Sequence, residues 1–405
     1  MNRLALALLG AAFLAWSADA CRECHSALDG NLGSPAKTYD ADIHGRRGFS
    51  CHDCHGGDPN KAELHGPMKV RRTTVAALCA RCHSNADLMH KFNPRPRVDQ
   101  HTQFLTSVHG KRLAAGDEAA ATCIDCHGVH GILPVKDPRS PTHPLKLPDT
   151  CSRCHSHSAR MAKYKIGTGQ YADYRQSVHW HALEQRGDLS APSCASCHGN
   201  HGAAPPQVGS VTAVCGSCHV LLEQLFSKSP HQPVFSMMSE GACTICHGNH
   251  KVEKPTPAML SGATSACVQC HEPDTKGGVA AAEMFTQSKK LSDALDRSDR
   301  RLSEARGFGM EVSEAQLKQI EAREQLVKAR VAVHTFDLAE FNKPVQEGLT
   351  LAAATLQAGD EAMREKDWRR IGLGLSLITI LVTIAGLRLA IRRLESNPAA
   401  PGEKG

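Results

Sequence analysis

The chain has 405 residues, a formal net charge of +6 at pH 7, 18 cysteines and 24 histidines, but only 4% aromatic residues. Soluble proteins of this size usually build their interior from aliphatic and aromatic side chains. Such a low aromatic content argues against an ordinary hydrophobic core. We therefore expect that something other than side chains fills much of the interior.

The first residues, MNRLALALLGAAFLAWSADA, predict a cleaved secretory signal. Arg3 supplies the positive start, residues 4–15 the apolar run, and Ala18-Asp19-Ala20 a small-residue cleavage site. An N-terminal anchor helix is the alternative, and it is less favoured because the apolar run is short. The mature chain would begin at Cys21.

Every cysteine belongs to a CxxCH motif. The nine motifs are Cys21-Cys24-His25, Cys51-Cys54-His55, Cys79-Cys82-His83, Cys123-Cys126-His127, Cys151-Cys154-His155, Cys194-Cys197-His198, Cys215-Cys218-His219, Cys243-Cys246-His247 and Cys267-Cys270-His271. CxxCH is the attachment sequence of c-type haem, in which both thiols bond to the porphyrin and the adjacent imidazole coordinates the iron. We predict nine covalently bound haem c groups, with these cysteines as thioether ligands and these histidines as proximal iron ligands.

Zinc sites and disulfides are the alternatives for these cysteines. A zinc site needs four ligands from paired clusters and gives no reason for a histidine after every second cysteine. A disulfide framework does not use the histidines at all. The propionates of nine haems would also more than cancel the net charge, so we expect basic residues to pair with propionates and expect no nucleic-acid partner.

Between Cys21 and His271 the chain repeats a two-haem unit. Residues 79–131 align with residues 151–202, and each copy runs from CxxCH through SVH to CxxCHGxH. Residues 215–250 are a shorter copy, and residues 21–65 are a looser copy. Repeats of this length usually form a linear stack of similar parts. The sequence predicts a mainly α-helical, loop-rich fold with four two-haem repeats and a ninth haem.

Each repeat carries two further histidines at matching positions, which we expect to be distal iron ligands. They are His44, His109, His179 and His231 upstream of the second motif, and His65, His130, His201 and His250 downstream of it. His130 follows proximal His127 by three residues, which is too close to reach the opposite face of the same porphyrin. We therefore expect His130, His201 and His250 to ligate neighbouring haems. Any one of the eight can instead be a surface-loop histidine.

Six other histidines do not recur between the repeats, and for them a surface or structural role is favoured. They are His52, His90, His101, His143, His157 and His181.

After His271 the composition changes to Ala, Glu, Lys, Arg and Leu, as is typical of long helices. The first predicted helix spans residues 279–306, and its apolar stripe contains Met284, Leu291, Leu295 and Leu302. Gly307 and Gly309 end it. A second helix begins near Glu311 and ends at Asn342-Lys343-Pro344, and its stripe contains Ile320, Val327, Val331, His334, Leu338 and Phe341. A third helix runs toward Trp368.

The lone His334 lies within the stripe of the second predicted helix. The first helix leaves the haem region over about 42 Å, and the second returns over about 36 Å by His334. An antiparallel hairpin would bring His334 back beside the ninth motif. We expect His334 to be the distal ligand of the haem at Cys267, Cys270 and His271. The alternative is a core histidine in a helical seam.

Residues 371–387, IGLGLSLITILVTIAGL, are uncharged and nearly long enough to cover a hydrocarbon core of about 30 Å. Arg388 can extend outward to the interface. A buried soluble helix is the alternative. Because the export signal places the haem region outside, we expect an inner-membrane protein with a periplasmic haem domain and a cytoplasmic C-terminus. The expected parts are a signal peptide (1–20), nine-haem domain (21–278), helical hairpin and stalk (279–369), transmembrane helix (370–391) and tail (392–405).

The segments SVHGKRL, CHGVHGILPVKDPRSP and ARVAVHTFD, with the C-terminal span, resemble membrane-anchored multihaem c-type cytochromes of anaerobic respiratory bacteria. That broad superfamily includes NapC/NrfH-type cytochromes and hydroxylamine oxidoreductase. The resemblance implies a membrane quinol-oxidising complex or the quinol pool as electron donor, and a periplasmic redox protein or terminal reductase as acceptor. Two departures stand out. The NapC/NrfH type has its anchor at the N-terminus, and catalytic members often carry an altered attachment motif.

Two functions are weighed from the sequence, and a quinol dehydrogenase is a third possibility, for which nothing in the apolar span marks a quinone site. An electron carrier needs two imidazoles on each iron, and the chain has enough histidines to supply them. An enzyme that reduces or oxidises a small nitrogen or sulfur compound needs one five-coordinate haem with acid–base residues near its open face. The ninth haem, or next the haem at Cys79 and Cys82, is the candidate for that role.

Overall fold

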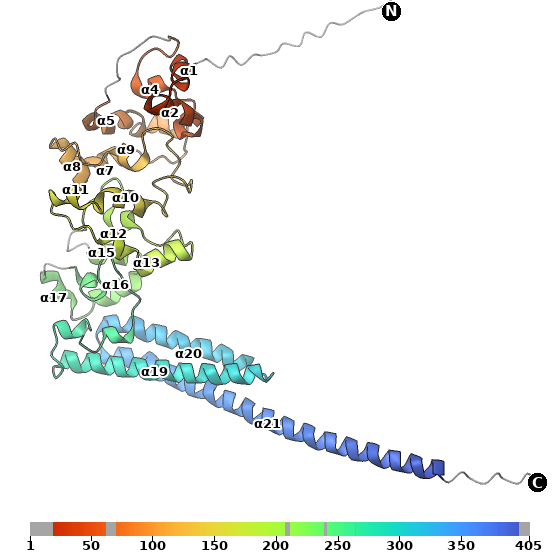
Figure 1. The fold of residues 1–405 in the computed structure, drawn as a ribbon. Coiled ribbons are helices and arrows are strands. Elements are labelled where there is room, and N and C mark those ends of the chain that lie inside the picture. The colour runs from red at the N-terminus through yellow and green to blue at the C-terminus, as the bar shows by residue number, and fades with distance from the viewer. Residues whose placement is uncertain (1–18, 62–69, 207–210, 239–240, 264, 397–405) are drawn as a thin grey trace, which may run out of the picture. The chain divides into compact units, whose positions relative to one another are not determined.

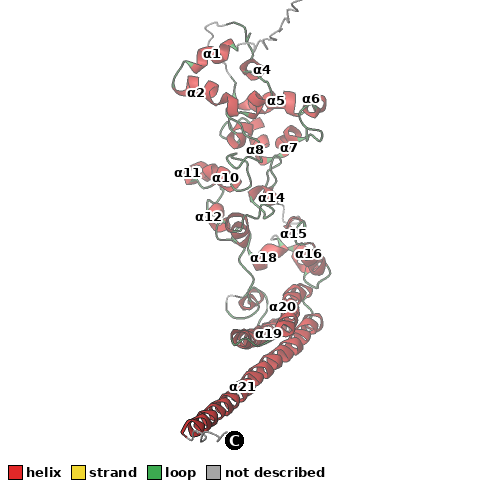
Figure 2. Cartoon of the chain, turned by 90° about the vertical axis from the view of Figure 1, so that its right-hand side faces the viewer, coloured by secondary structure: helices red, strands yellow, loops and turns green. Residues whose placement is uncertain are grey.

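The computed structural model describes residues 19–61, 70–206, 211–238, 241–263 and 265–396. Throughout these ranges the chain forms helices, turns and loops and no strand (Figure 2), which confirms the predicted mainly α, loop-rich fold. The chain divides into two compact units, residues 1–210 with 247–254, and residues 211–246 with 255–405. Most of the predicted signal peptide, His65 and most of the predicted tail lie outside the described residues.

The first unit consists of short helices joined by long loops (Figure 1). Its helices are α1 (Ala20–Ser26), α2 (Gly30–Thr38), η1 (Tyr39–Ala41), α3 (Ile43–Arg46), α4 (Cys51–His55), α5 (Arg72–His83), α6 (Ala86–His90), α7 (Gln100–Thr106), α8 (Val108–Ala114), α9 (Cys123–His127), α10 (Leu147–His155), α11 (Ser158–Ala162), α12 (Gln170–Tyr174), α13 (Val178–Trp180), η2 (His181–Gln185) and α14 (Cys194–His198). Isolated helices of this length are marginal in water. Their stability must therefore come from what they pack against.

The second unit combines short helices with three long ones. Its helices are α15 (Val211–Gly216), α16 (Val220–Ser227), α17 (Gln232–Met237), α18 (Ala242–His247), η4 (Pro257–Met259), η5 (Cys267–Gln269), α19 (Lys276–Gly307), α20 (Ser313–Ala332), η6 (Val333–Thr335) and α21 (Leu338–Ser396). The long helices α19, α20 and α21 lie side by side (Figure 1). Gly309, which has a φ of +76°, follows α19 in the turn to α20.

The three long helices enclose the apolar clusters of the described chain. One cluster contains Leu291, Leu295, Leu326, Phe341 and Val345, and a second surrounds Leu302 and Met363. All four apolar residues of the predicted first-helix stripe are buried here. In the described part of the first unit, buried apolar side chains such as Val75, Leu113 and Leu183 do not join into such a cluster.

The predicted stripe of the second helix is wrong. Ile320 and Val327 are 56% and 57% exposed, and α20 instead buries Ala315, Gln319, Ala322, Gln325, Leu326 and Ala329. Small side chains let the helices approach closely. The buried Gln319 amide nitrogen donates to the Leu295 carbonyl at 3.0 Å, and its side-chain oxygen accepts from Ser298 and Thr355. Because these hydrogen bonds satisfy the polar groups of Gln319, α20 can bury a face that its hydrophobicity alone would not predict.

The predicted end of the second helix at Pro344 is also wrong. The α20 helix ends at Ala332, and Phe336 adopts a left-handed conformation with a φ of +55°. The Asp337 carboxylate accepts from the backbone of Ala339 at 2.7 Å, which caps the start of α21. Pro344 then lies inside α21. Local capping therefore sets this boundary, and a proline in the second turn is tolerated.

The 59-residue helix α21 continues past the bundle without interruption. One 18-residue segment of this helix has a mean hydropathy of 2.1 and is not buried, so by length and composition the helix can cross a membrane. Just before this segment, Lys366 and Arg370 lie over the Phe308 ring, at 4.6 and 5.3 Å from its centre. Phe308 is in the turn after α19, so this turn packs beside the start of the apolar segment.

Replacing Leu295 with Ala should lower the free energy of unfolding of the helical bundle by about 2–5 kcal/mol, because it leaves a cavity in the larger cluster. Urea unfolding of the full-length holoprotein in detergent, followed by far-ultraviolet circular dichroism, measures this. Leu317→Ala is the matched control, because Leu317 is 63% exposed on α20, and it should change the free energy by less than about 0.5 kcal/mol. Equal effects of the two substitutions would contradict the packing described here.

Candidate haem-binding sites

The CxxCH motifs of the first unit occur in two local settings. The first motif of a repeat lies at the C-terminal end of a helix, as in α5 and α10. The second motif forms a complete short helix by itself, as in α4, α9 and α14. Ser50, Thr122 and Ser193 cap these three helices with reciprocal side-chain and backbone hydrogen bonds. Each of these three second motifs therefore has a capping residue that starts its own helix.

A glycine follows the histidine of every second motif. Gly56, Gly128, Gly199 and Gly248 all have φ between +71° and +87°. This region of backbone conformation is costly for residues with a Cβ atom. The CHG sequence thus turns the chain sharply after the proximal histidine and leads it away toward the downstream histidine.

Six pairs of predicted proximal and distal histidines face each other. Their ring centres are 6.0 Å apart for His44 and His83, 5.9 Å for His55 and His130, 6.1 Å for His109 and His155, 6.1 Å for His127 and His201, 5.9 Å for His198 and His250, and 5.9 Å for His231 and His271. Two metal–nitrogen bonds of about 2 Å each, plus the distance from each nitrogen to its ring centre, require about 6 Å. The pairs therefore fit an iron held between two imidazoles.

These pairs follow one register along the repeats. In these pairs the downstream histidine meets the second motif of the preceding repeat, as His130 meets His55. The upstream histidine of a pair meets the motif that begins the next repeat or the ninth motif, as His44 meets His83 and His231 meets His271. In every described pair the two imidazoles come from different repeats, or from a repeat and the ninth motif. The pairing thus ties neighbouring repeats together.

The structure differs from the sequence-based expectation at the ninth motif. His271 faces His231, which comes from the preceding repeat, while the distal role expected of His334 stays a prediction. His334 lies in η6, and its electrostatic neighbour is His219 of the seventh motif. The α20 helix ends before His334, and η6 packs against α16, which directly follows His219. The early end of α20 explains the difference, because it turns His334 toward α16.

The remaining candidate ligands have the following positions. The His25 Nδ1 atom lies 3.0 Å from the Leu32 carbonyl oxygen. His179 lies in α13, two residues after the cap residue Ser177, and His247 ends α18. His65 lies outside the described residues. The proximal and distal roles of all these histidines stay predictions.

Burial acts on most of these imidazoles in the same way. It lowers the pKa of His83, His109, His127, His130, His155, His201, His231, His250 and His334. A lowered pKa favours the neutral imidazole, which is the form that coordinates a metal.

The cysteines of consecutive motifs also lie next to each other. Within a repeat, hydrogen bonds join Cys79 to Cys123, Cys151 to Cys194 and Cys215 to Cys243. The bond from Cys123 lowers the pKa of Cys79 to about 7. Between motifs of successive repeats, the neighbours are Cys54 and Cys79, Cys126 and Cys151, and Cys246 and Cys267. Within each unit the motifs therefore follow one another in space in their sequence order.

The cysteines can be compared with the zinc and disulfide alternatives. The structure forms no disulfide at the CxxCH motifs. Among the described residues, no three His, Cys, Asp or Glu side chains converge as a metal-ligand cluster. The fit is instead to porphyrins held by two thiols and two imidazoles. A c-type haem bound at such a site supplies a one-electron Fe(III)/Fe(II) couple.

Three of the six non-recurring histidines have local structural partners. His157 caps α11, and its Nδ1 atom accepts from the Arg160 backbone at 3.3 Å. Buried His143 accepts from the Leu145 backbone through Nδ1, also at 3.3 Å. The His52 ring hydrogen-bonds the Ser50 hydroxyl. These contacts match the structural role favoured from the sequence.

Two residues near the candidate ligands were not identified from the sequence. The Asp42 carboxylate lies 3.0 Å from the Nδ1 atom of His44, and the centre of the Phe336 ring lies 3.9 Å from that of His231. The Asp-x-His spacing at 42–44 is a sequence signal that could have indicated the first. Nothing in the local sequence indicates the second, because it depends on the left-handed turn at Phe336.

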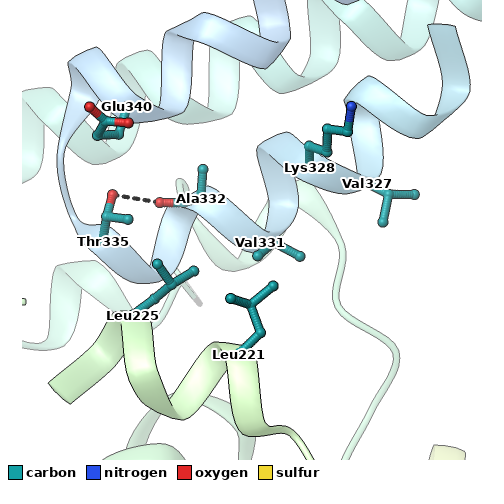
Figure 3. A pocket seen from close by; sticks show the side chains of 8 residues that line it. All are labelled: Leu221, Leu225, Val327, Lys328, Val331, Ala332, Thr335 and Glu340. Carbon is teal, nitrogen blue, oxygen red and sulfur yellow. Dashed lines mark hydrogen bonds between the residues drawn. The ribbon is translucent and has the colours of Figure 1, made fainter. Parts of the chain in front are cut away.

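An open apolar groove lies near the seventh motif (Figure 3). It is lined by Leu221 and Leu225 of α16, Val327, Lys328, Val331 and Ala332 of α20, Thr335 of η6, and Glu340 of α21. The Thr335 hydroxyl donates to the Ala332 carbonyl at 2.7 Å. The lining contains no cysteine or histidine, so the groove is not itself a haem ligand set.

Comparison with known proteins identifies one related segment. Residues 188–272 match the family model of cytochrome c3. The match covers four of the nine CxxCH motifs, those that end at His198, His219, His247 and His271. No curated protein and no solved structure matches the chain. The match and the motifs together support a multihaem c-type cytochrome that transfers electrons through covalently bound haem.

The orientation of the paired rings predicts two spectroscopic classes of haem. The interplanar angles are 88°, 61° and 87° for the pairs that contain an upstream histidine, and 22°, 8° and 10° for those that contain a downstream histidine. Crossed imidazole planes leave the iron orbitals nearly degenerate, whereas parallel planes split them. Electron paramagnetic resonance of the oxidised holoprotein should resolve highly anisotropic and rhombic low-spin signals. A single class would contradict these ring orientations.

Replacing His130 with Ala should convert one haem from low to high spin, because it removes the imidazole opposite His55. The high-spin ferric signal in the same resonance experiment measures this. His90→Ala is the matched control, since His90 is exposed at the end of α6. If both variants keep only low-spin iron, His130 is not a distal ligand.

Proposed function

We propose that this protein is a membrane-anchored, nine-haem electron carrier that links a membrane quinol-oxidising complex to a periplasmic redox protein or terminal reductase. The observation that carries the proposal is the set of six imidazole pairs with ring centres 5.9–6.1 Å apart. A pair that occupies both faces of an iron leaves no coordination position for a substrate. It also allows a change of oxidation state with little rearrangement.

The cysteine contacts support transfer between neighbouring sites. Adjacent motifs bring their sulfurs together, as at Cys79 and Cys123, and each porphyrin would be tethered through those sulfurs. Neighbouring porphyrins would consequently lie edge to edge, which keeps each transfer short. The histidine pairs between repeats would keep those repeats in register, so that this spacing is maintained within each unit.

The C-terminal helix supports the anchoring. The apolar part of α21 is exposed along its length, and Trp368, which is 74% exposed, lies just before it. Tryptophan is common at the boundary between membrane and water. Lys366 and Arg370 flank the same boundary and contact Phe308. We place the haem part in the periplasm and the residues after the span in the cytoplasm, because c-type haem is attached outside the cytoplasm.

The length of α21 bears on the electron donor. Residues 338–370 precede the apolar segment, and at about 1.5 Å per residue they extend about 50 Å. Phe336, directly before α21, packs on His231 of the ninth-motif site. That site is therefore remote from the lipid along the helix. A protein donor that extends out of the membrane suits this geometry better than quinol within the bilayer.

Full-length holoprotein, fully reduced in liposomes, should deliver nine electron equivalents to a soluble one-electron acceptor. Stopped-flow absorbance of the haem bands measures the yield. Nitrite or hydroxylamine should produce no high-spin signal and no change in the oxidised spectrum. A high-spin ferric haem whose signal shifts with either compound would favour a catalytic site and contradict the carrier.

Ending the chain after residue 369 should release the holoprotein from the membrane fraction, because the apolar segment of α21 is removed. Its haem spectrum should stay unchanged, since no CxxCH motif or histidine follows His334. Ultracentrifugation of cell lysates with haem staining measures the distribution. A truncated protein that still sediments with membranes would show that another part of the chain anchors it.

A further inference from the structure

Asp42 is held rigidly beside a candidate iron ligand. It is 7% exposed and caps the short helix α3. Its Oδ1 atom accepts from the His44 backbone at 2.8 Å and lies 3.0 Å from His44 Nδ1. Its Oδ2 atom accepts from the Ile132 backbone at 2.8 Å, and the Ile43 amide donates back to the Ile132 carbonyl at 2.8 Å. The carboxylate is thus fixed from two separate segments of the first unit.

The ring of His83 lies opposite that of His44. The centres of His44 and His83 are 6.0 Å apart with an interplanar angle of 88°. Burial, and then the neighbouring His44, lower the pKa of His83. Asp42 contacts the His44 ring through Nδ1, the nitrogen that would not bind iron.

We propose that Asp42 is a positioning residue that orients His44 and lowers the reduction potential of the haem iron that His44 and His83 would hold. The inference rests on the proposed function and extends it to the control of one site. An imidazole that donates its second N–H group to a carboxylate becomes a stronger donor through its other nitrogen. Stronger donation stabilises ferric over ferrous iron, and so does a nearby negative charge in a partly buried site.

The pair at the ninth motif provides the contrast. His231 has a buried Nδ1 atom without a hydrogen-bond partner among the described residues. Its ring packs against Phe336, with centres 3.9 Å apart, and lies 5.9 Å from the Phe235 ring. His231 is therefore the weaker donor in an apolar environment that disfavours the more highly charged ferric state. The iron between His231 and His271 should have the higher potential of the two.

The step that this difference controls is a single electron transfer. An electron that left the third-motif site would oxidise its iron from ferrous to ferric and would reduce the accepting iron from ferric to ferrous, with no bond made or broken. Asp42 would shift the balance of this exchange toward the ferric state at its own site.

Asp42→Asn tests the proposal, because it keeps the shape of the side chain and removes its charge. In full-length holoprotein, a potentiometric titration followed by absorbance and by electron paramagnetic resonance should show one highly anisotropic haem shifted to higher potential. We expect about a tenfold change in its ferric-to-ferrous ratio at fixed potential, which equals about 59 mV for one electron. Asp40→Asn is the matched control, since Asp40 pairs with Arg22, is 76% exposed and does not contact His44. It should leave all potentials unchanged.

The outcomes separate this inference from the proposed function. An Asp42→Asn protein with nine low-spin haems and unchanged potentials would overturn the role of Asp42 and leave the electron carrier intact. If that variant does not retain its haems, the reduction potentials of the unmodified protein provide the test. Its highly anisotropic signals should titrate at clearly different potentials, and coincident midpoints would overturn the inference. Fewer than nine haems, or an open iron, in the unmodified protein would instead contradict the function.

Discussion

On the proposed haem ligation, the structure depends on one constraint, the need to place a second imidazole opposite each proximal histidine. A CxxCH motif fixes two sulfurs and one imidazole on one side of a porphyrin, and the residues next to it cannot reach the other side. The second ligand must come from elsewhere in the chain. In the described pairs it comes from an adjoining repeat, as His130 does for His55. The pairing of ligands therefore also sets the order of neighbouring repeats and the spacing of their sites.

This constraint explains how the chain can fold with few aromatic residues. The apolar clusters of the described chain lie in the bundle of α19, α20 and α21. The first unit has scattered buried residues, such as Trp180 and Leu183, and many short helices that would be marginal alone. Porphyrins held from both faces would supply apolar surface and cross-links to that unit. The bundle, by contrast, has a side-chain core of its own.

The sequence was informative where the chemistry is local or repeated. The CxxCH motifs, the glycine after each second motif and the leucine stripe of α19 are short patterns with direct physical meaning. His130 follows His127 by only three residues, and this short separation is enough to predict that it cannot reach the opposite face of the same porphyrin. The sequence was misleading where packing depends on partners. Gln319 determines the buried face of α20 through Ser298 and Thr355, and capping by Asp337 outweighs Pro344. The same boundary places His334 in η6 beside α16, and the ring that faces His271 is that of His231.

The central claim is that each of the nine motifs holds one iron and that the described pairs each hold an iron between imidazoles of different segments. A crystallographic map of the holoprotein with anomalous scattering at the iron edge tests it most directly. The account predicts nine iron peaks, including one between His55 and His130 and one between His231 and His271. A peak at His55 whose opposite ligand is not His130, or fewer than nine peaks, would contradict it.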